Sequence, residues 1–173
     1  MGRVALPLQF TLTIQGGTLQ DVVGLFSGLL TRGSMRQKKT PILNRRVRQF
    51  LQKPRVARLA TVGADGYPHI VPIWFRRDGD DIVFGSDRSN RKVRNALANP
   101  KGAVVIGGEL PIDDEGYMIQ GDLSIADDVN HASMWKMLLR YETKKEAARL
   151  AAEWADSDLV VIRLKPRKVI RVY

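Results

Sequence analysis

The apolar positions of the chain change their spacing near residue 55. Upstream of this point, four apolar residues recur at the spacing of one helical face: Leu43, Val47, Phe50 and Leu51. Thr40-Pro41 is a typical helix start, because threonine caps the first turn and proline fits the first helical position. Pro54 is a typical helix end. The pattern therefore predicts one short helix ahead of residue 54.

Downstream of residue 55, apolar and polar positions alternate, as is typical of β-strands. The runs "VARLATV", "YPHIVPIWFRR" and "IVFGS" are separated by turns that contain Asp65-Gly66 and Asp78-Gly79, dipeptides typical of hairpins. Pro68 and Pro72 fall in or beside the second run. Because proline cannot donate a ladder hydrogen bond, this strand is predicted to be irregular or to lie at an edge.

The second half of the chain adds more strands and one helical region. "GAVVIGGE" and "GYMIQGDLSIAD" are predicted to be strands, divided by the acidic loop "LPIDDE". Residues 128–155 are predicted to be helical, with a break near "YETKK". "DLVVIRL" and "KVIRVY" are predicted to close the chain as a pair of strands around Lys165-Pro166. About six strands at hairpin spacing, with few and segregated helices, predict an antiparallel β-barrel of the α+β class.

Residues 1–34 differ from the rest of the chain, since Arg3, Asp21 and Arg32 are their only charges. The apolar run in this segment is too short and too glycine-rich to span a bilayer, and it makes a poor signal peptide. Met35 then opens a strongly charged segment. We expect residues 1–34 to be a leader that is not native, and residues 35–173 to form a single domain. The alternative is an arm that packs on a neighbouring subunit.

The formal net charge is +10, from 28 Lys and Arg against 18 Asp and Glu. This balance favours an anionic partner, such as nucleic acid, a phosphorylated cofactor or a polyanionic substrate, although it also serves solubility. The chain has no cysteine, which excludes disulfides, thiolate nucleophiles and cysteine-ligated metals and fits a cytoplasmic protein. The two histidines, His69 and His131, show no metal-ligand spacing, so no metal is expected.

Catalysis by protein side chains alone has little support. The chain contains neither a G-x-S-x-G elbow nor a P-loop. The acidic cluster of Asp113, Asp114 and Glu115 falls in a loop, where a solvated turn is the favoured interpretation. His69 falls in a strand, where an isolated histidine usually has a structural role. No residue is therefore predicted to be catalytic.

One stretch, "SDRSNRKVRNALANP", raises an electrostatic question. It predicts a short helix that begins after Ser89 or Asn90, ends at Pro100, and turns Val93, Ala96 and Leu97 to one side. Its first turn carries Arg91 and Lys92 but no acid. The positive pole of a helix makes each such cation unfavourable by about 0.3–1 kcal/mol.

A bound phosphate would reverse this penalty. It would gain from the helix N–H groups, from Arg91 and Lys92, and from the hydroxyls of Ser86 and Ser89. In the alternative, both cations extend into water with little effect on stability. The spacing alone leaves these two interpretations open.

Residues 55–106 resemble the flavin-binding split β-barrels of the pyridoxamine 5'-phosphate oxidase-like superfamily, in particular the branch associated with the deazaflavin coenzyme F-420. The resemblance lies in "LATV", the "DG-x-P-H" turn, "VPIWF" and "RKVRN-x-x-x-NP" followed by an apolar strand, and it extends over most of residues 41–173. It implies a six-stranded split barrel with flanking helices. It also implies a homodimer whose flavin mononucleotide (FMN) or deazaflavin lies at the subunit interface.

The resemblance also assigns site residues. The cofactor phosphate would contact Arg91, Lys92 and the hydroxyl of Ser86. The ring would lie along the backbone of the second strand at Val71, Pro72, Ile73 and Trp74, with Thr61 as a further candidate on the neighbouring strand. Pyridoxamine phosphate oxidases proper carry an arginine and a lysine at the ends of this strand, where the present chain has the apolar run from Ile70 to Phe75.

The leading hypothesis is therefore a flavin- or deazaflavin-dependent oxidoreductase, in which the cofactor transfers hydride to or from a small-molecule substrate. The alternative is a non-catalytic flavin or haem carrier, or a stress-related module on the same barrel. A nucleic-acid-binding barrel would need aromatics interleaved with basic residues on one sheet face, and the sequence offers few. Neither nucleic acid nor a membrane is expected as a partner.

Overall fold

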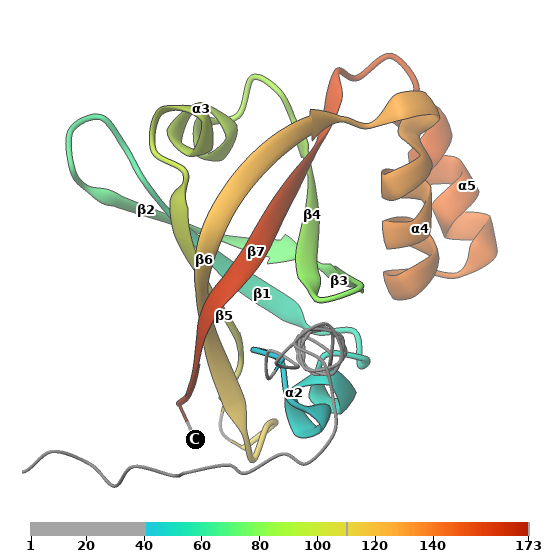
Figure 1. Cartoon of the computed structure of the whole chain (residues 1–173). Coiled ribbons are helices and arrows are strands. Elements are labelled where there is room, and N and C mark those ends of the chain that lie inside the picture. Colours follow the sequence, from blue (N-terminus) through green and yellow to red (C-terminus); the bar gives the residue numbers. More distant parts are fainter. Residues whose placement is uncertain (1–40, 110, 173) are drawn as a thin grey trace, which may run out of the picture. The chain divides into compact units, whose positions relative to one another are not determined.

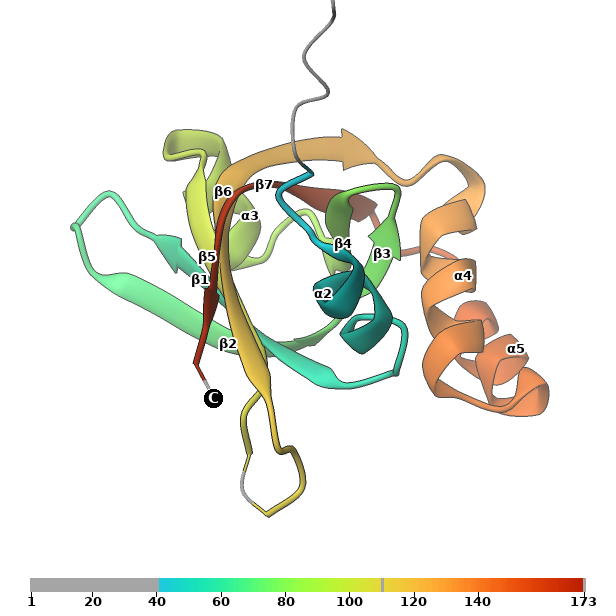
Figure 2. The same cartoon turned by 60° about the horizontal axis from the view of Figure 1, so that its bottom comes forward.

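One seven-stranded antiparallel sheet dominates the part of the chain that the computed structural model describes, residues 41–109 and 111–172 (Figure 1). The order of its strands is β2-β1-β5-β6-β7-β4-β3. The strands are β1 (Val56–Val62), β2 (Pro68–Trp74), β3 (Arg76–Asp78), β4 (Asp81–Asp87), β5 (Lys101–Gly107), β6 (Gly116–Asp127) and β7 (Leu159–Arg171). The sheet curls into a split barrel with flanking helices (Figure 2). The predicted α+β fold is confirmed, with seven strands rather than six.

Two strand boundaries differ from the predicted runs. The predicted run "YPHIVPIWFRR" is interrupted at Phe75, which divides it into β2 and β3. Conversely, the predicted pair of closing strands is wrong, because residues 159–171 form one continuous strand, β7. A bulge makes this continuity possible: Gln120 lies opposite Lys168 and Gly121 opposite Pro166, so Arg167 is an extra residue in the ladder. The proline therefore ends no strand.

The two edge strands of the barrel are joined by the covalent chain and not by a ladder of interstrand hydrogen bonds. β2 and β3 lie at opposite ends of the strand order, yet only Phe75 separates them in sequence. Phe75 is fully buried, and its peptide groups bond to a side chain. Its N–H donates to the Tyr141 hydroxyl oxygen at 3.1 Å, and this hydroxyl lies 3.0 Å from the carbonyl of Phe75 and 2.7 Å from that of Arg55. Tyr141 thus satisfies backbone groups that leave the ladder at the closure point.

A short helix covers one end of the barrel (Figure 2). This helix, α2 (Arg45–Phe50), is capped by Asn44, whose side chain accepts the N–H of Val47 at 3.0 Å. Thr40 lies outside the described residues, but the predicted helix start at Pro41 is wrong, because the helix begins at Arg45 and Asn44 supplies its cap. The predicted apolar face is confirmed, since all four of its residues are buried in the barrel core: Leu43, Val47, Phe50 and Leu51.

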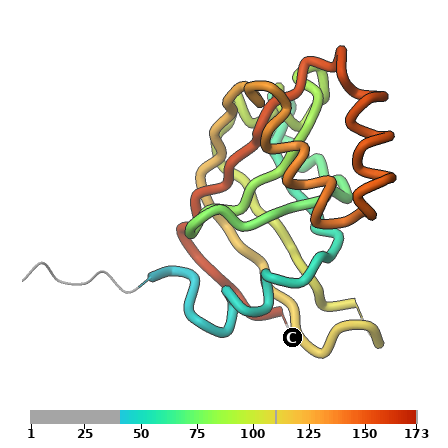
Figure 3. The backbone as a smooth tube through the Cα atoms, turned by 90° about the vertical axis from the view of Figure 1, so that its right-hand side faces the viewer, coloured from blue at the N-terminus to red at the C-terminus, as the bar shows by residue number. Residues whose placement is uncertain are grey.

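Two packed helices stand beside the barrel (Figure 3). A single 3-10 turn, η1 (Val129–His131), leads into α4 (Ala132–Tyr141), and α5 (Lys144–Glu153) follows after the predicted break. Met134, Met137 and Leu138 form a second apolar cluster, and α4 contacts β4. No helix in residues 41–109 and 111–172 has the length and apolar character that a membrane span requires.

Within residues 41–109 and 111–172, the outward face of β1, β2 and β5 carries exposed apolar side chains. Cross-strand partners point to the same face of a sheet, and Ala60 lies opposite both Ile70 and Ala103. Ile70 is 62% exposed and Val56 is 46% exposed. We call this surface the outer apolar face and define it by Val56, Ala60, Ile70, Pro72 and Val105.

Replacing Tyr141 by phenylalanine is expected to destabilise the barrel. The change removes one oxygen and leaves backbone groups of Phe75 and Arg55 without their partner, which should lower the free energy of unfolding by about 1–3 kcal/mol. Urea unfolding with an unchanged slope would measure this loss. The control is Tyr67→Phe, since Tyr67 is 73% exposed. If the two variants were equally stable, the Tyr141 hydroxyl would not contribute to the stability of the barrel closure.

Candidate functional site

The helix α3 (Arg91–Ala98) starts without a side-chain cap. Its N-cap is Asn90, one of the two residues predicted for this position. The Asn90 side chain makes no capping hydrogen bond. Val93 and Ala96 are buried as predicted. The prediction that Leu97 lies on the same buried side is wrong, because Leu97 is 65% exposed. Asn95 is buried there instead. No acid lies in the first turn, so the positive pole of α3 keeps its unpaired N–H groups.

Arg91 is held by the turn between β1 and β2. Its Nη2 lies 3.1 Å from Oδ2 of Asp65, and both side chains are about half exposed. An exposed ion pair of this kind contributes at most about 1 kcal/mol. The guanidinium can therefore exchange this carboxylate for another anion at little loss.

Lys92 is the unusual cation of the pair. Its ammonium is half-buried, and burial lowers its pKa from the usual 10.5, with a smaller opposing effect from Asp87. Within residues 41–109 and 111–172, no carboxylate forms an ion pair with it. A desolvated charge without a partner is unfavourable, and an anion at this point would relieve it.

The two predicted serines are occupied within their own turn. The Ser86 hydroxyl is buried and donates to the Asp87 carbonyl at 3.1 Å. The Ser89 hydroxyl and N–H donate to Oδ1 of Asp87 at 2.6 and 2.8 Å, and these hydrogen bonds lower the pKa of Asp87. Both hydroxyls would have to rotate before they could donate to a phosphate.

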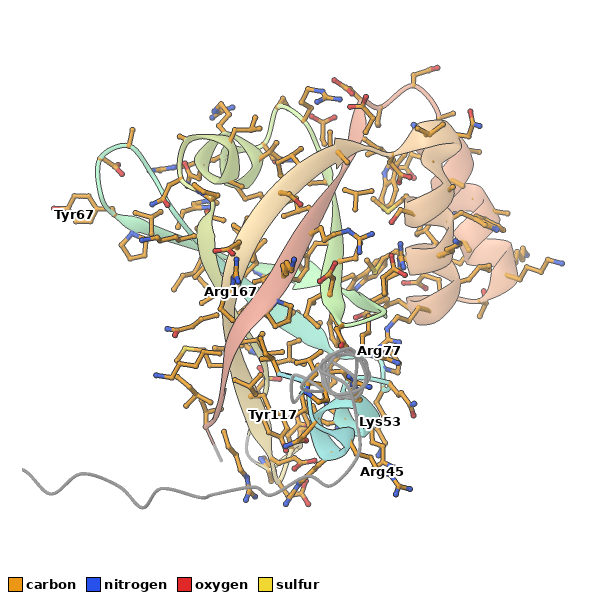
Figure 4. The ribbon with its side chains drawn as sticks, viewed as in Figure 1. Arg45, Lys53, Tyr67, Arg77, Tyr117 and Arg167 are labelled. Atoms are coloured by element: carbon orange, nitrogen blue, oxygen red, sulfur yellow. The ribbon has the colours of Figure 1, made fainter. Side chains whose placement is uncertain are left out.

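The β1–β2 turn packs closely against α3. A Cβ added to Gly63 would lie 2.6 Å from Oδ1 of Asp65 and 3.5 Å from both Nη2 of Arg91 and Oδ1 of Asn95. The absence of a side chain at Gly63 therefore lets the Asp65 carboxylate pack against this backbone, beside the guanidinium of Arg91. Asn95 in turn donates to the buried Thr61 hydroxyl at 3.1 Å. Thr61 faces the barrel interior, where it holds α3 in place. Tyr67 projects from the same turn, away from the strands (Figure 4).

The predicted ring-lining stretch runs along an edge strand. β2 is hydrogen-bonded to β1 alone, so its second edge offers backbone N–H and C=O groups, as its prolines predicted. Val71 and Ile73 point inward and pack against the core, whereas Pro72 points outward. Trp74 stacks on Tyr141, with ring centroids 4.8 Å apart and planes 6° from parallel.

A small hollow joins this stretch to β4. Ile73, Trp74 and Gly85 line a space of about 130 Å³, and Gly85 directly precedes Ser86. The nine predicted residues thus form two groups, one along β2 and one around the start of α3. Ser86 points into the barrel, on the face of β4 opposite to the one where Gly85 meets Met134, so this hollow does not connect the two groups.

The sequence analysis missed one candidate, His69. Its half-buried ring carries an Nδ1 atom that finds no partner in the described residues, and it lies opposite Thr61 in the ladder. The structure therefore adds His69 to the candidate site. Nothing local in the sequence distinguishes it, because its environment depends on the packing of β2 beside β1.

The acidic loop between β5 and β6 is structural rather than solvated. Asp113 is 8% exposed and bonds to Arg55 at 2.8 Å, whereas Glu115 accepts hydrogen bonds from Arg46 and the Tyr117 hydroxyl, both at 2.9 Å. For Asp113 and Glu115, the solvated-turn interpretation is wrong, since they tie α2 to the sheet. No group of three His, Asp or Glu side chains in the described ranges is arranged to hold a metal.

Replacing Lys92 by methionine is expected to change how stability depends on alkaline pH. The ammonium is disfavoured in the folded state, so the unfolded state binds this proton more tightly. The wild-type protein should therefore gain free energy of unfolding as the pH rises towards 10.5, the usual value for lysine, and Lys92→Met should gain less. Urea unfolding at a series of pH values measures this. Lys145→Met, at an exposed lysine of α5, should behave as the wild type; identical curves for all three would contradict the burial of Lys92.

Comparisons with known proteins agree with this geometry. A search of curated proteins finds no match. Among solved structures, an F420 reductase is 27% identical, with a TM-score of 0.57 over 70% of this chain and 94% of that one. A conserved hypothetical protein of Mycobacterium tuberculosis is 19% identical, with a TM-score of 0.61 over 77% and 87%. The haem storage protein HutZ of Vibrio cholerae is 18% identical, with a TM-score of 0.58 over 74% and 93%.

The likeness to the last two structures shows the fold alone, which is the split barrel built here from β1 to β7. A family model described as pyridoxamine 5'-phosphate oxidase matches residues 43–173, which include the uncapped helix, the edge strand and the closing strand. The chain therefore belongs to the pyridoxamine 5'-phosphate oxidase family.

Proposed function

We propose that this protein is an oxidoreductase that uses a phosphorylated flavin, either FMN or coenzyme F-420, and that it works as a homodimer. The observation that carries the proposal is the half-buried, unpaired ammonium of Lys92 at the uncapped start of α3. A phosphate at this point would meet helix N–H groups, the ammonium and an exchangeable guanidinium together. The residues present therefore fit the phosphate of such a cofactor.

The remaining candidate residues would position the cofactor. Arg91 and Lys92 would hold the phosphate, and Ser86 and Ser89 would contribute once their hydroxyls turn away from Asp87. The free backbone edge of β2 would hold the ring beside Trp74. When bound, the flavin supplies hydride transfer, and the protein supplies binding, orientation and exclusion of water.

The family name does not fix the substrate. The apolar run from Ile70 to Phe75 offers no charged side chain for pyridoxamine phosphate, so its oxidation is not proposed. The 27% identity to an F420 reductase and the basic net charge support the deazaflavin, whose tail is polyanionic. FMN carries the same phosphate chemistry and is the second choice.

A non-catalytic carrier or stress-related module is the alternative. The likeness to a haem storage protein shows that the fold serves such a role elsewhere. The two hypotheses differ in turnover: an oxidoreductase lets a nicotinamide or deazaflavin donor reduce the bound cofactor and a defined acceptor reoxidise it. A carrier binds without turnover.

The homodimer is supported by the outer apolar face. Among the described residues, Ile70 and Val56 are large apolar side chains that are 62% and 46% exposed on this face. A second copy would bury this face and shield the open edge of β2.

Replacing both Arg91 and Lys92 by alanine is expected to weaken flavin binding at least tenfold, because charge-assisted phosphate contacts contribute about 1.5–3 kcal/mol. Absorbance titrations with FMN and, separately, with coenzyme F-420 measure this and identify the cofactor. The matched control is Lys144→Ala with Lys145→Ala, which removes two adjacent cations from the first turn of α5. The control should bind as the wild type.

Asp65→Asn tests the same site, but it is expected to strengthen flavin binding rather than weaken it. It keeps the turn geometry, because the amide oxygen can still accept the N–H of Tyr67, but it releases Arg91 and should tighten flavin binding. Unchanged affinity in both the double variant and Asp65→Asn would exclude the start of α3 from the site.

Replacing Ile70 by lysine is expected to convert the dimer into monomers, because it places a charge at the most exposed large side chain of the outer apolar face. Light scattering coupled to gel filtration measures the mass. The control is Val129→Lys, which changes a residue that is 71% exposed on η1. A dimer that persists in Ile70→Lys would show that another surface forms the interface.

A further inference from the structure

A cavity in the described residues lies away from the proposed flavin site. It measures about 760 Å³ and is lined by none of the nine predicted residues. It lies beside α4 and α5, where β6 runs into η1 and where the chain enters β7 (Figure 1). Its apolar lining includes the indoles of Trp135 and Trp154 and the side chains of Met134 and Leu138. Two indoles in one cavity offer flat faces to a ligand.

Carboxylates gather at this cavity. Asp127 and Asp158 share a single partner, Arg88, at 2.6 and 2.7 Å, and the two hydrogen bonds raise the pKa of its guanidinium. Asp128 is buried and accepts the N–H groups of Ser133 and Met134 at 2.7 and 2.8 Å, at the start of α4. Three carboxylates and one guanidinium give the lining a formal charge of −2, in a chain whose net charge is +10.

Asp127 and Asp158 each keep one carboxylate oxygen that can accept a further hydrogen bond. Arg88 contacts Oδ1 of Asp127 and Oδ2 of Asp158, and the second oxygen of each accepts no hydrogen bond from the described residues. Both side chains are well exposed, at 75% and 65%. A positively charged group at the mouth could therefore contact both without displacing Arg88.

The backbone at the mouth is fixed in an uncommon conformation. Asn130 and His131 both have left-handed φ angles, of 53° and 50°, and both line the cavity. Successive non-glycine residues in this region are unfavourable unless surrounding contacts hold them. Asp128 supplies such a contact, since its carbonyl accepts the N–H of His131 at 2.9 Å. This hydrogen bond supports the left-handed turn that lines the cavity.

We propose that this cavity binds a small organic cation with an aromatic or similarly flat apolar body. Its ammonium group would lie between Asp127 and Asp158, and its body against the indoles of Trp135 and Trp154. Tryptophan faces attract cations, and the carboxylates add a local field opposite in sign to that of the whole chain. The same field disfavours anions, so the cavity and the proposed phosphate site select ligands of opposite charge.

The two sites adjoin through one side chain. Trp154 lines the cavity and also the hollow that contains Ile73 and Trp74 of β2. An aromatic cation bound in the cavity would therefore lie one indole away from the stretch proposed to line the flavin. The cation site itself does not depend on the flavin proposal, because none of its lining residues contributes to the phosphate site.

Calorimetry on flavin-free protein with benzyltrimethylammonium tests the inference, with phenylacetate and benzyl alcohol as the anionic and neutral comparisons. We expect saturable binding of the cation, quenching of tryptophan fluorescence, and at least tenfold weaker binding of phenylacetate. Added salt should weaken cation binding, since the carboxylates are exposed.

Asp127→Asn with Asp158→Asn is expected to weaken cation binding at least tenfold. The matched control is Asp80→Asn, which removes an exposed carboxylate that pairs with Arg48 at 2.8 Å elsewhere on the barrel. Should the double variant fail to fold, Trp135→Leu tests the apolar half, because Trp135 is 36% exposed and its loss should also weaken binding about tenfold. Equal binding of phenylacetate, no saturation by the cation, or full affinity in the variant tested would overturn the inference. Failure of flavin binding would not contradict the inference that this cavity binds an organic cation.

Discussion

The fold depends on the way in which the barrel closes at Phe75. This residue ends one edge strand and precedes the other, so its peptide groups lie where neither ladder continues. The Tyr141 hydroxyl binds them and the Arg55 carbonyl, and the Arg140 guanidinium lies 5.1 Å from the centre of the Phe75 ring. Because Tyr141 and Arg140 are the last residues of α4, this single contact also fixes the helical pair to the barrel.

The same contact positions the candidate ring site. Trp74 stacks on Tyr141, and its neighbours on β2 offer the free backbone edge. A side chain that closes the barrel thus also orients the residue proposed to lie beside a flavin. The closure of the barrel and the proposed ring site therefore depend on the same side chain.

Two helices of this protein begin with adjacent cations, and the surroundings distinguish them. In α5, Thr143 accepts the N–H of Glu146, and the exposed Lys144 and Lys145 meet water and a nearby acid. In α3 the cap makes no bond, no acid follows, and Lys92 is half-buried. Both helices therefore begin with two cations, but only α5 has an acid in its first turn. Only the second arrangement leaves a charge unsatisfied, and this supports a role in anion binding.

Much of the fold follows from local patterns in the sequence. Alternation located β1, β4, β5 and β6, and helical spacing identified the four residues with which α2 covers the barrel. Features that depend on distant neighbours did not follow. The break at Phe75 requires Tyr141, and the continuity of β7 past Pro166 requires a bulge opposite Gly121, where a Cβ would overlap the carbonyl of Lys165.

The candidate site shows the same division. The spacing of Arg91 and Lys92 at a helix start was visible in the sequence, and so was the edge character of β2. The sequence could not show that both serine protons are used within their turn, that Asp65 holds Arg91, or that His69 keeps a nitrogen without a partner. These contacts join segments whose proximity only the folded barrel creates.

The contact between β2 and β4 has a mechanical consequence. These two strands touch but share no ladder, so the wall between them is held by side-chain packing alone. Parting the wall along this line breaks no interstrand hydrogen bond, whereas widening it anywhere else would rupture a row of them. The barrel wall therefore opens most easily between β2 and β4. A flat ligand that enters between these strands has to separate side chains but no hydrogen-bonded strands.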